Sequence, residues 1–256
     1  MKKKSNPKLT LPEDVAIQVS HVSKHFSLRA NSSIKESIIK LFTPKKKRHH
    51  DQQFHALDDI SFTIDKGETV GLIGVNGSGK STMLKMISGV MQPDSGDVLI
   101  RGRLAGLIEV GAGFASELTG RENVYLNGAI LGLSEKQIDE RYDDIVAFSG
   151  IEPFMDTEVK FYSSGMFLRL AFAVAVYSNP DIFLIDEILA VGDEAFQHKC
   201  IERLKEQQKQ GQTMVIVSHS EGQIKELCQR CIVLAHSHVI FDGDPEEAFN
   251  VMRQNL

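Results

Sequence analysis

The sequence predicts an α/β fold, and three observations support this. An apolar, strand-forming run at residues 69–73 leads through a glycine-rich loop into the helix-forming residues 83–87. Two later apolar segments, residues 181–187 and 213–219, end in acidic or polar side chains. Between the loop and these segments the alternation of strand and helix stops, so we expect a helical insertion subdomain at about residues 114–178.

The glycine-rich loop has the complete G-x-x-x-x-G-K-[ST] pattern of a P-loop. Its residues are Gly74, Val75, Asn76, Gly77, Ser78, Gly79, Lys80, Ser81 and Thr82. The glycines let successive N–H groups face one anion, and the following helix directs its positive end at the same point. Lys80 is then placed to reach the β- and γ-phosphates, and the Ser81 hydroxyl to ligate Mg²⁺. We expect this run to bind ATP.

The composition is that of a globular protein with a sizeable core, at 42% hydrophobic and 25% charged residues. The net charge of −5 argues against a general nucleic-acid binder, although residues 2–4 and 45–48 are basic clusters. No apolar stretch of a secretory signal follows the first residues, and the longest apolar segment, residues 168–176, is far shorter than the roughly 20 residues of a spanning helix. We expect a cytoplasmic protein whose membrane partner is a separate chain.

The three cysteines, Cys200, Cys228 and Cys231, leave an odd thiol in any pairing, which fits a reducing compartment. Cys228 and Cys231 have C-x-x-C spacing, for which a redox or metal role is one interpretation. No second pair completes a zinc site, and the segment runs from a helix into a strand at residues 231–234. We therefore favour buried structural thiols.

Strands are predicted at residues 15–22 and 60–64, separated by an insertion at about residues 28–53. The insertion has an amphipathic helical pattern followed by the basic cluster at residues 45–48. Two interpretations stay open. It is either a surface excursion that packs on its own domain, or a contact with the membrane surface or with a partner.

A single domain is expected over residues 15–250, with a flexible polar tail at residues 1–14 and a second tail at residues 251–256. Within the helical insertion, Thr119 and Ser134 each begin a capping box, which predicts the start of a helix at each position.

The segment at residues 181–187 reads as a buried strand that ends in Asp186 and Glu187. In P-loop ATPases such a strand lies beside the P-loop, and we expect the same here. Asp186 would then hold Mg²⁺, and Glu187 would face the γ-phosphate as the general base for water. The segment at residues 213–219 likewise delivers His219 to the edge of the sheet where ligands bind.

These elements, in this order, resemble the ATP-binding subunits of ABC transporters, and the resemblance covers residues 15–250. That family carries a serine–glycine signature at the start of a helix, and Ser163, Ser164 and Gly165 stand at this place. The local sequence differs from Leu-Ser-Gly-Gly-Gln but keeps Ser163 and Gly165. The resemblance implies a P-loop NTPase fold with an antiparallel β subdomain. It also implies a homodimer in which the signature of one copy faces the ATP held by the other.

The resemblance assigns further residues. Glu109 stands where the family has a glutamine that approaches Mg²⁺, and Asp193 ends a loop similar to the family's dimer-contact loop. Phe26 is the candidate for stacking on adenine. The insertion after it leaves Phe54 and His55 as rivals.

Residues 107–114 and 117–123, together with the altered signature, look like one subfamily, the ATPases of cell-envelope polysaccharide exporters. This implies an ATP-hydrolysing motor, peripheral on the cytoplasmic face of the membrane, with a separate polytopic transmembrane subunit. Its substrate would be a lipid-linked polysaccharide such as a teichoic acid, an O-antigen or a galactan.

Two other functions are weighed against this one. A soluble ABC ATPase that acts on ribosomes or DNA usually has tandem ATPase domains or a long coiled coil, whereas this chain has one P-loop. An importer ATPase is disfavoured by the hinge and the signature.

Overall fold

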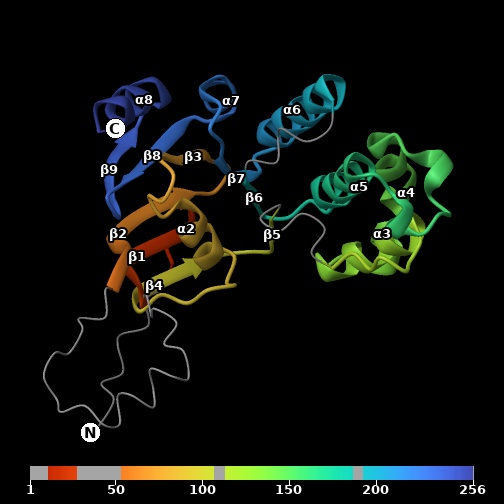
Figure 1. The fold of residues 1–256 in the computed structure, drawn as a ribbon, viewed down its shortest axis with the longest axis horizontal. Helices are drawn as coiled ribbons and strands as arrows, with labels where there is room; N and C mark the ends of the chain where they lie inside the picture. Colours follow the sequence, from red (N-terminus) through yellow and green to blue (C-terminus); the bar gives the residue numbers. More distant parts are fainter. Residues whose placement is uncertain (1–10, 28–52, 107–112, 187–192, 256) are drawn as a thin grey trace, which may run out of the picture.

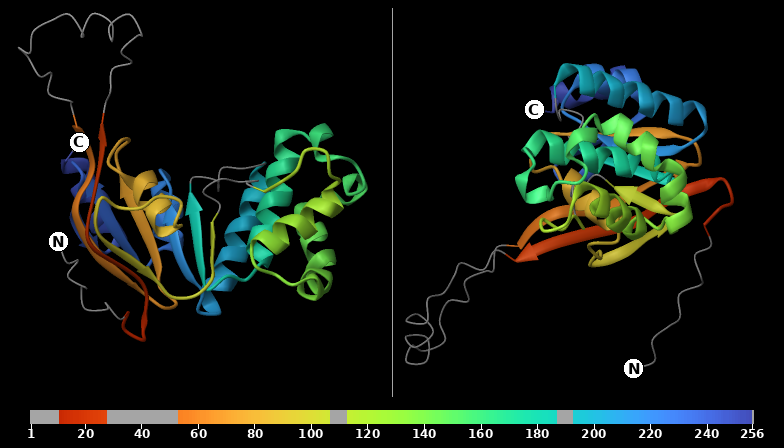
Figure 2. Two further views of the ribbon diagram at one scale, coloured as in Figure 1. Left: turned by 90° about the horizontal axis from the view of Figure 1, so that it is seen from below. Right: turned by 90° about the vertical axis from the view of Figure 1, so that its right-hand side faces the viewer.

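The structure is a computed structural model that describes residues 11–27, 53–106, 113–186 and 193–255. Two sheets lie side by side, and three helices project from one end of the larger sheet (Figure 1). Figure 2 shows the smaller sheet at one end of the molecule and these helices at the other. The predicted α/β architecture is therefore present.

The larger sheet places the predicted loop near its centre. Its strand order is β5-β6-β7-β3-β8-β9, and the described pairs are parallel except for β8 with β9. β3 (Thr69–Gly74) is buried along its whole length, as expected for a central parallel strand. The other strands are β5 (Leu104–Gly106), β6 (Ile182–Asp186), β7 (Thr213–Val217), β8 (Arg230–Ala235) and β9 (His238–Gly243). The carboxyl ends of β3, β6 and β7 meet at one edge.

The smaller sheet is antiparallel, with the order β2-β1-β4. Its strands are β1 (Val15–Ser27), β2 (Gln53–Asp65) and β4 (Ser95–Ile100). β1 and β2 are longer than the predicted strands. Their pairing continues past shifts in register, near which His21 and Asp59 have positive φ angles of 50° and 52°. Ser27 pairs with Gln53, so the predicted insertion joins two paired strands. Its residues 28–52 lie outside the described residues.

The helical arm consists of α3 (Gly120–Ile130), α4 (Glu135–Ser149) and α5 (Ser164–Tyr177). The capping boxes predicted at Thr119 and Ser134 are both formed, because each side chain accepts a backbone N–H of the first turn while the N3 side chain bonds back. The turn between α4 and α5 adds short 3₁₀ segments at Glu152–Phe154 and Val159–Phe161. The predicted helical stretch is thus confirmed.

The remaining helices are α2 (Lys80–Ile87), α6 (Glu194–Lys209), α7 (Glu221–Leu227) and α8 (Pro245–Gln254). The expected tail at residues 251–256 was wrong for residues 251–254. α8 continues there because the Asp244 side chain caps its start, Pro245 occupies the first turn, and Phe249 is buried. No described helix is long and apolar enough to cross a bilayer.

Two hydrophobic clusters hold these layers together. One lies between the two sheets and includes the buried face of α2. The other lies between the larger sheet and the helices. There Phe148 stacks on Phe172, and Phe196 meets both rings edge to face, with ring centroids 5.7–6.1 Å apart. This aromatic contact joins the helical arm to α6.

Candidate functional site

The loop after β3 has the backbone shape that its glycines predicted. Gly77 and Gly79 have φ of 82° and 105°, in the left-handed region that favours glycine. A Cβ at Gly74 would lie 2.2 Å from the carbonyl oxygen of Leu234, and one at Gly79 would lie 2.6 Å from that of Ala56. Glycine is therefore required at both ends of the loop, because the main chain passes directly against β8 and β2.

Lys80 places its ammonium group inside the curl of the loop. The residue is only 7% exposed, and Nζ donates to the carbonyl oxygens of Gly74 at 2.7 Å and Val75 at 3.1 Å. The Ser78 hydroxyl is buried nearby without a hydrogen-bond partner among the described residues. A buried cation and an unsatisfied donor in one loop fit an anion with several oxygen acceptors.

The start of α2 adds further donors to the same place. Its N-cap is Gly79, no side chain caps it, and its first turn holds no acidic residue. The first backbone N–H groups therefore keep their capacity to bind an anion, and the helix dipole favours negative charge there. Ser81 in this turn is exposed.

A hollow of about 180 Å³ opens above the loop. One wall is formed by residues of the loop and α2, and the other by Phe54 and Ala56 of β2. Phe54 is 47% exposed, and its cross-strand partner is Phe26. His55 follows Phe54 on the alternating strand and instead contacts His25, with ring centroids 4.2 Å apart. Of the three aromatic candidates, Phe54 is the one that lines the hollow.

Asp186 and His219 lie at the same edge of the sheet as the loop. Asp186 is the last residue of β6, and His219 stands two residues after the end of β7. β6 and β3 are not direct neighbours in the sheet, because β7 pairs with both and lies between them. The hydrophobic pattern of the sequence does not show the order of parallel strands in a sheet. From the pattern alone, either β6 or β7 could have been the strand next to β3. His219 is exposed.

The predicted signature begins a helix on the arm. Ser163 caps α5, and its hydroxyl accepts the Met166 N–H at 3.2 Å. Ser163 and Ser164 are exposed, and a Cβ at Gly165 would meet only the Ser163 hydroxyl, at 3.9 Å. α5 lies well apart from α2 in Figure 1 and in Figure 2. The structure thus brings the P-loop, Asp186 and His219 to one edge of the sheet and places the signature elsewhere.

The ABC transporter family profile matches residues 57–190, more than half of the chain. The chain belongs to the ABC transporter family. A solved dimeric ATP-binding cassette with bound ADP and phosphate has a TM-score of 0.70 at 23% identity, covering 90% of this chain and 98% of that one. This likeness confirms the predicted fold class.

Three relatives are similar in sequence to this chain over most of its length. The O-antigen export system ATP-binding protein RfbB of Klebsiella pneumoniae is 42% identical over 94% of this chain and 98% of RfbB. The teichoic acids export ATP-binding protein TagH of Listeria monocytogenes is 44% identical over 92% of this chain and 69% of TagH. The ABC transporter protein AbcA of Aeromonas salmonicida is 52% identical over 75% of this chain, which spans only 63% of AbcA.

Asp193 is held by two contacts in this ABC domain. As the N-cap of α6, its carboxylate accepts a hydrogen bond from the Phe196 N–H at 2.9 Å. It also accepts one from the guanidinium group of Arg169, on α5, at 2.7 Å. Both contacts lower the pKa of Asp193, and the hydrogen bond from the Phe196 N–H has the larger effect. Sequence reasoning did not use Arg169, although a cation inside the apolar segment at residues 168–176 was a visible signal.

Several predicted site residues lie outside the described residues. They are Glu187, Glu109 and the dimer-contact loop before Asp193. Their roles stay predictions.

The C-x-x-C pair is buried, as expected for structural thiols. Burial raises the pKa of Cys231 to about 12 and also raises the pKa of Cys228. Both sulfurs pack around Gly71, where a Cβ would lie 2.8 Å from Cys231 Sγ and 3.3 Å from Cys228 Sγ. Within the described ranges, no group of three or more histidine, cysteine or acidic residues could hold a metal ion.

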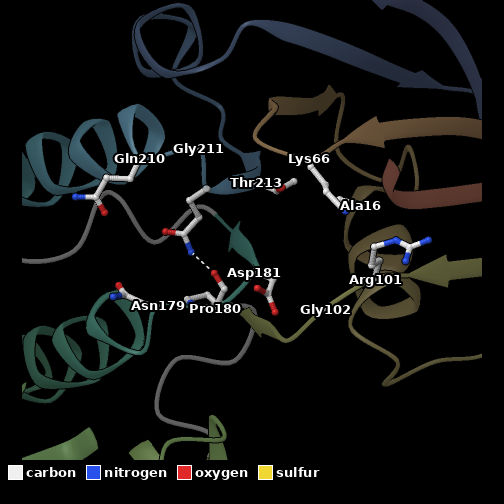
Figure 3. Close-up of a pocket in the computed structure, with 11 residues that line it drawn as sticks. Ala16, Lys66, Arg101, Gly102, Asn179, Pro180, Asp181, Gln210, Gly211 and Thr213 are labelled. Atoms are coloured by element: carbon white, nitrogen blue, oxygen red, sulfur yellow. Dashed lines mark hydrogen bonds between the residues drawn. The ribbon is translucent and has the colours of Figure 1, made fainter. Parts of the chain in front are cut away.

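A larger hollow, of about 530 Å³, lies at the opposite edge of the sheet, where β6 and β7 begin (Figure 3). Several polar side chains that line it bond within the protein. Asp181 accepts the Arg103 N–H at 2.6 Å, and the Gln212 amide donates to the Pro180 carbonyl at 2.7 Å. The smaller hollow is the one lined by the loop and the start of α2, so we take it as the candidate phosphate site.

Proposed function

We propose that this chain is the ATP-hydrolysing subunit of an ABC exporter that moves a lipid-linked cell-envelope polysaccharide across the cytoplasmic membrane. The observation that carries the ATP-binding part is the hollow lined by Lys80 and the start of α2. The Ser78 hydroxyl of the same loop is buried without a hydrogen-bond partner among the described residues. The names of RfbB and TagH support the polysaccharide part. They leave O-antigen, teichoic acid and galactan open as the class of polymer.

In this proposal the triphosphate lies against residues 74–82, with Lys80 at the β- and γ-phosphates. Phe54 packs against the adenine, in place of the first candidate Phe26, because Phe54 lines the hollow. Ser81 and Asp186 are the oxygen ligands offered to Mg²⁺, with Glu109 as a further candidate. The ion supplies charge neutralisation on the phosphates when it is bound.

For hydrolysis, Glu187 is proposed as the general base that takes a proton from the attacking water. It follows Asp186 directly in sequence and therefore starts from the edge that carries the phosphate loop. His219, from the neighbouring β7, is proposed to contact the γ-phosphate.

We further propose that two copies enclose two ATP molecules. The exposed signature residues Ser163 and Ser164 begin a helix that lies apart from the P-loop of the same chain, so they are available to the nucleotide of a second copy. Asp193, which caps α6 and pairs with Arg169 of the signature helix, links the two sites.

The subunit would then lie on the cytoplasmic face of the membrane, bound to a separate polytopic subunit. Co-expression of the chain with the membrane protein encoded beside it, followed by detergent extraction and affinity purification, tests this. We expect a stable complex with ATPase activity that Lys80→Ala abolishes. ATP turnover by the chain with no retained membrane protein would instead support an ABC ATPase without a membrane partner.

A further inference from the structure

The turn between β8 and β9 lies beside β2, at the segment that walls the phosphate hollow (Figure 1). The Ser237 hydroxyl donates to the His55 carbonyl at 2.5 Å, and the Ser237 carbonyl accepts the Asp58 N–H at 2.9 Å. His238 Nδ1 lies 2.8 Å from the Asp58 carbonyl oxygen, so this nitrogen carries the hydrogen. The turn therefore grips β2 on both sides of Ala56 and Leu57.

The backbone conformation of this turn does not by itself favour serine. His236 and Ser237 have φ of 48° and 68°, both in the left-handed region. A two-residue hairpin turn with two positive φ angles favours asparagine followed by glycine. Serine at the second position tolerates the strain and adds the hydroxyl that reaches His55.

The gripped segment also touches the phosphate loop directly. The Ala56 carbonyl would lie 2.6 Å from a Cβ at Gly79, and Phe54 and Ala56 line the hollow. On its other side, the loop begins against the Leu234 carbonyl at the end of β8. The turn that follows β8 thus bridges the two strands between which the loop is held.

We propose that Ser237 and His238 are positioning residues for nucleotide binding, which act by fixing the Phe54–His55 segment as a wall of the hollow. The inference rests on the proposed function, in which Phe54 packs on adenine. Phe54 is the second residue of β2, and its backbone pairs with Phe26 near the end of β1. Loss of the Ser237–His55 bond would loosen this end while the loop keeps its own contacts.

The variants to compare are Ser237→Ala and Ser237→Gly, with Ser61→Ala as the matched control. Ser61 is also on β2 and also bonds a backbone group, the His21 N–H at 2.8 Å, but it is not at the hollow. Ser237→Ala removes only the hydroxyl, whereas Ser237→Gly removes the whole side chain and suits the positive φ of this position. Binding of ATP and of inorganic tripolyphosphate is measured by calorimetry, and steady-state ATPase gives KM and kcat.

Both Ser237 variants should weaken ATP binding by about three- to tenfold, the range of one neutral hydrogen bond. Tripolyphosphate binding and kcat should not change, since neither depends on Phe54. Ser61→Ala should bind ATP like the wild type. If Ser237→Gly bound ATP normally, or if tripolyphosphate binding fell as much as ATP binding, the hydroxyl would have no role through the adenine wall.

A double-mutant cycle with Phe54→Ala decides the route. In the Phe54→Ala background, Ser237→Ala should have no further effect on ATP affinity. Additive losses would contradict the inference while leaving the nucleotide site itself intact. If the proposed function itself were wrong, the wild type would bind neither ATP nor tripolyphosphate, which is a different result.

Discussion

Alanine in place of Gly79 should destabilise the protein more than alanine in place of Gly77. Both positions have positive φ, 105° and 82°, so a side chain strains the backbone at each by about 1–2 kcal/mol. Among the described residues, an added Cβ at Gly77 meets nothing within 4 Å, whereas at Gly79 it would lie 2.6 Å from the Ala56 carbonyl oxygen. Overlap with packed atoms costs about 1–3 kcal/mol more. We expect losses of about 1–2 kcal/mol for Gly77→Ala and about 2–5 kcal/mol for Gly79→Ala.

Urea unfolding followed by circular dichroism measures both losses from the transition midpoints, provided that the slopes agree. Gly211→Ala is the control for backbone strain alone, since φ is 80° there and an added Cβ meets nothing within 4 Å in the part of the chain that the structure describes. It should match Gly77→Ala. Equal losses at Gly77 and Gly79 would refute the conclusion that the loop packs directly on β2.

Three further predictions concern the site and its surroundings. Glu187→Gln should keep ATP affinity but stop turnover, and ATP-dependent dimers should accumulate in size-exclusion chromatography, because an amide cannot accept the proton of water; normal turnover would remove Glu187 from this role. The Asp193→Asn variant should be less stable than the wild type at pH 7, because the lowered pKa of Asp193 gives stability while the carboxylate is ionised. The difference should begin to shrink below about pH 4, the pKa of an unperturbed aspartate, and should disappear only once the pH has fallen through the lowered pKa. An undiminished difference at the acid end of the range would exclude ionic stabilisation. Cys228 and Cys231 should resist iodoacetamide at pH 8 in the native protein and react in urea, since burial raises both pKa values; fast native labelling would contradict their burial.

Structural features that depend on neighbouring residues were predicted well from the sequence. The phosphate loop and the capping boxes at Thr119 and Ser134 depend on residues a few positions apart, so their spacing alone predicts the backbone. The C-terminal helix was missed beyond residue 250, although Asp244 and Pro245 were local start signals.

Features that depend on distant pairing were predicted less well. The wall at Phe54 exists because β2 begins at Gln53, pairs with β1 from Ser27 onward and passes over Gly79. Hydrophobic pattern does not show this, because the positive φ of Asp59 interrupts the alternation within β2. The same limit applies to the strand order, in which β7 lies between β3 and β6.

Transport by the reconstituted complex tests the central claim most directly. The chain and its membrane subunit are placed in vesicles with a labelled lipid-linked polysaccharide, and movement of the label to the far leaflet is followed with and without ATP. The account predicts ATP-dependent movement that is lost with Lys80→Ala although the complex still assembles. Movement that continues with Lys80→Ala, or ATP hydrolysis by an assembled complex that moves no polysaccharide, would contradict it.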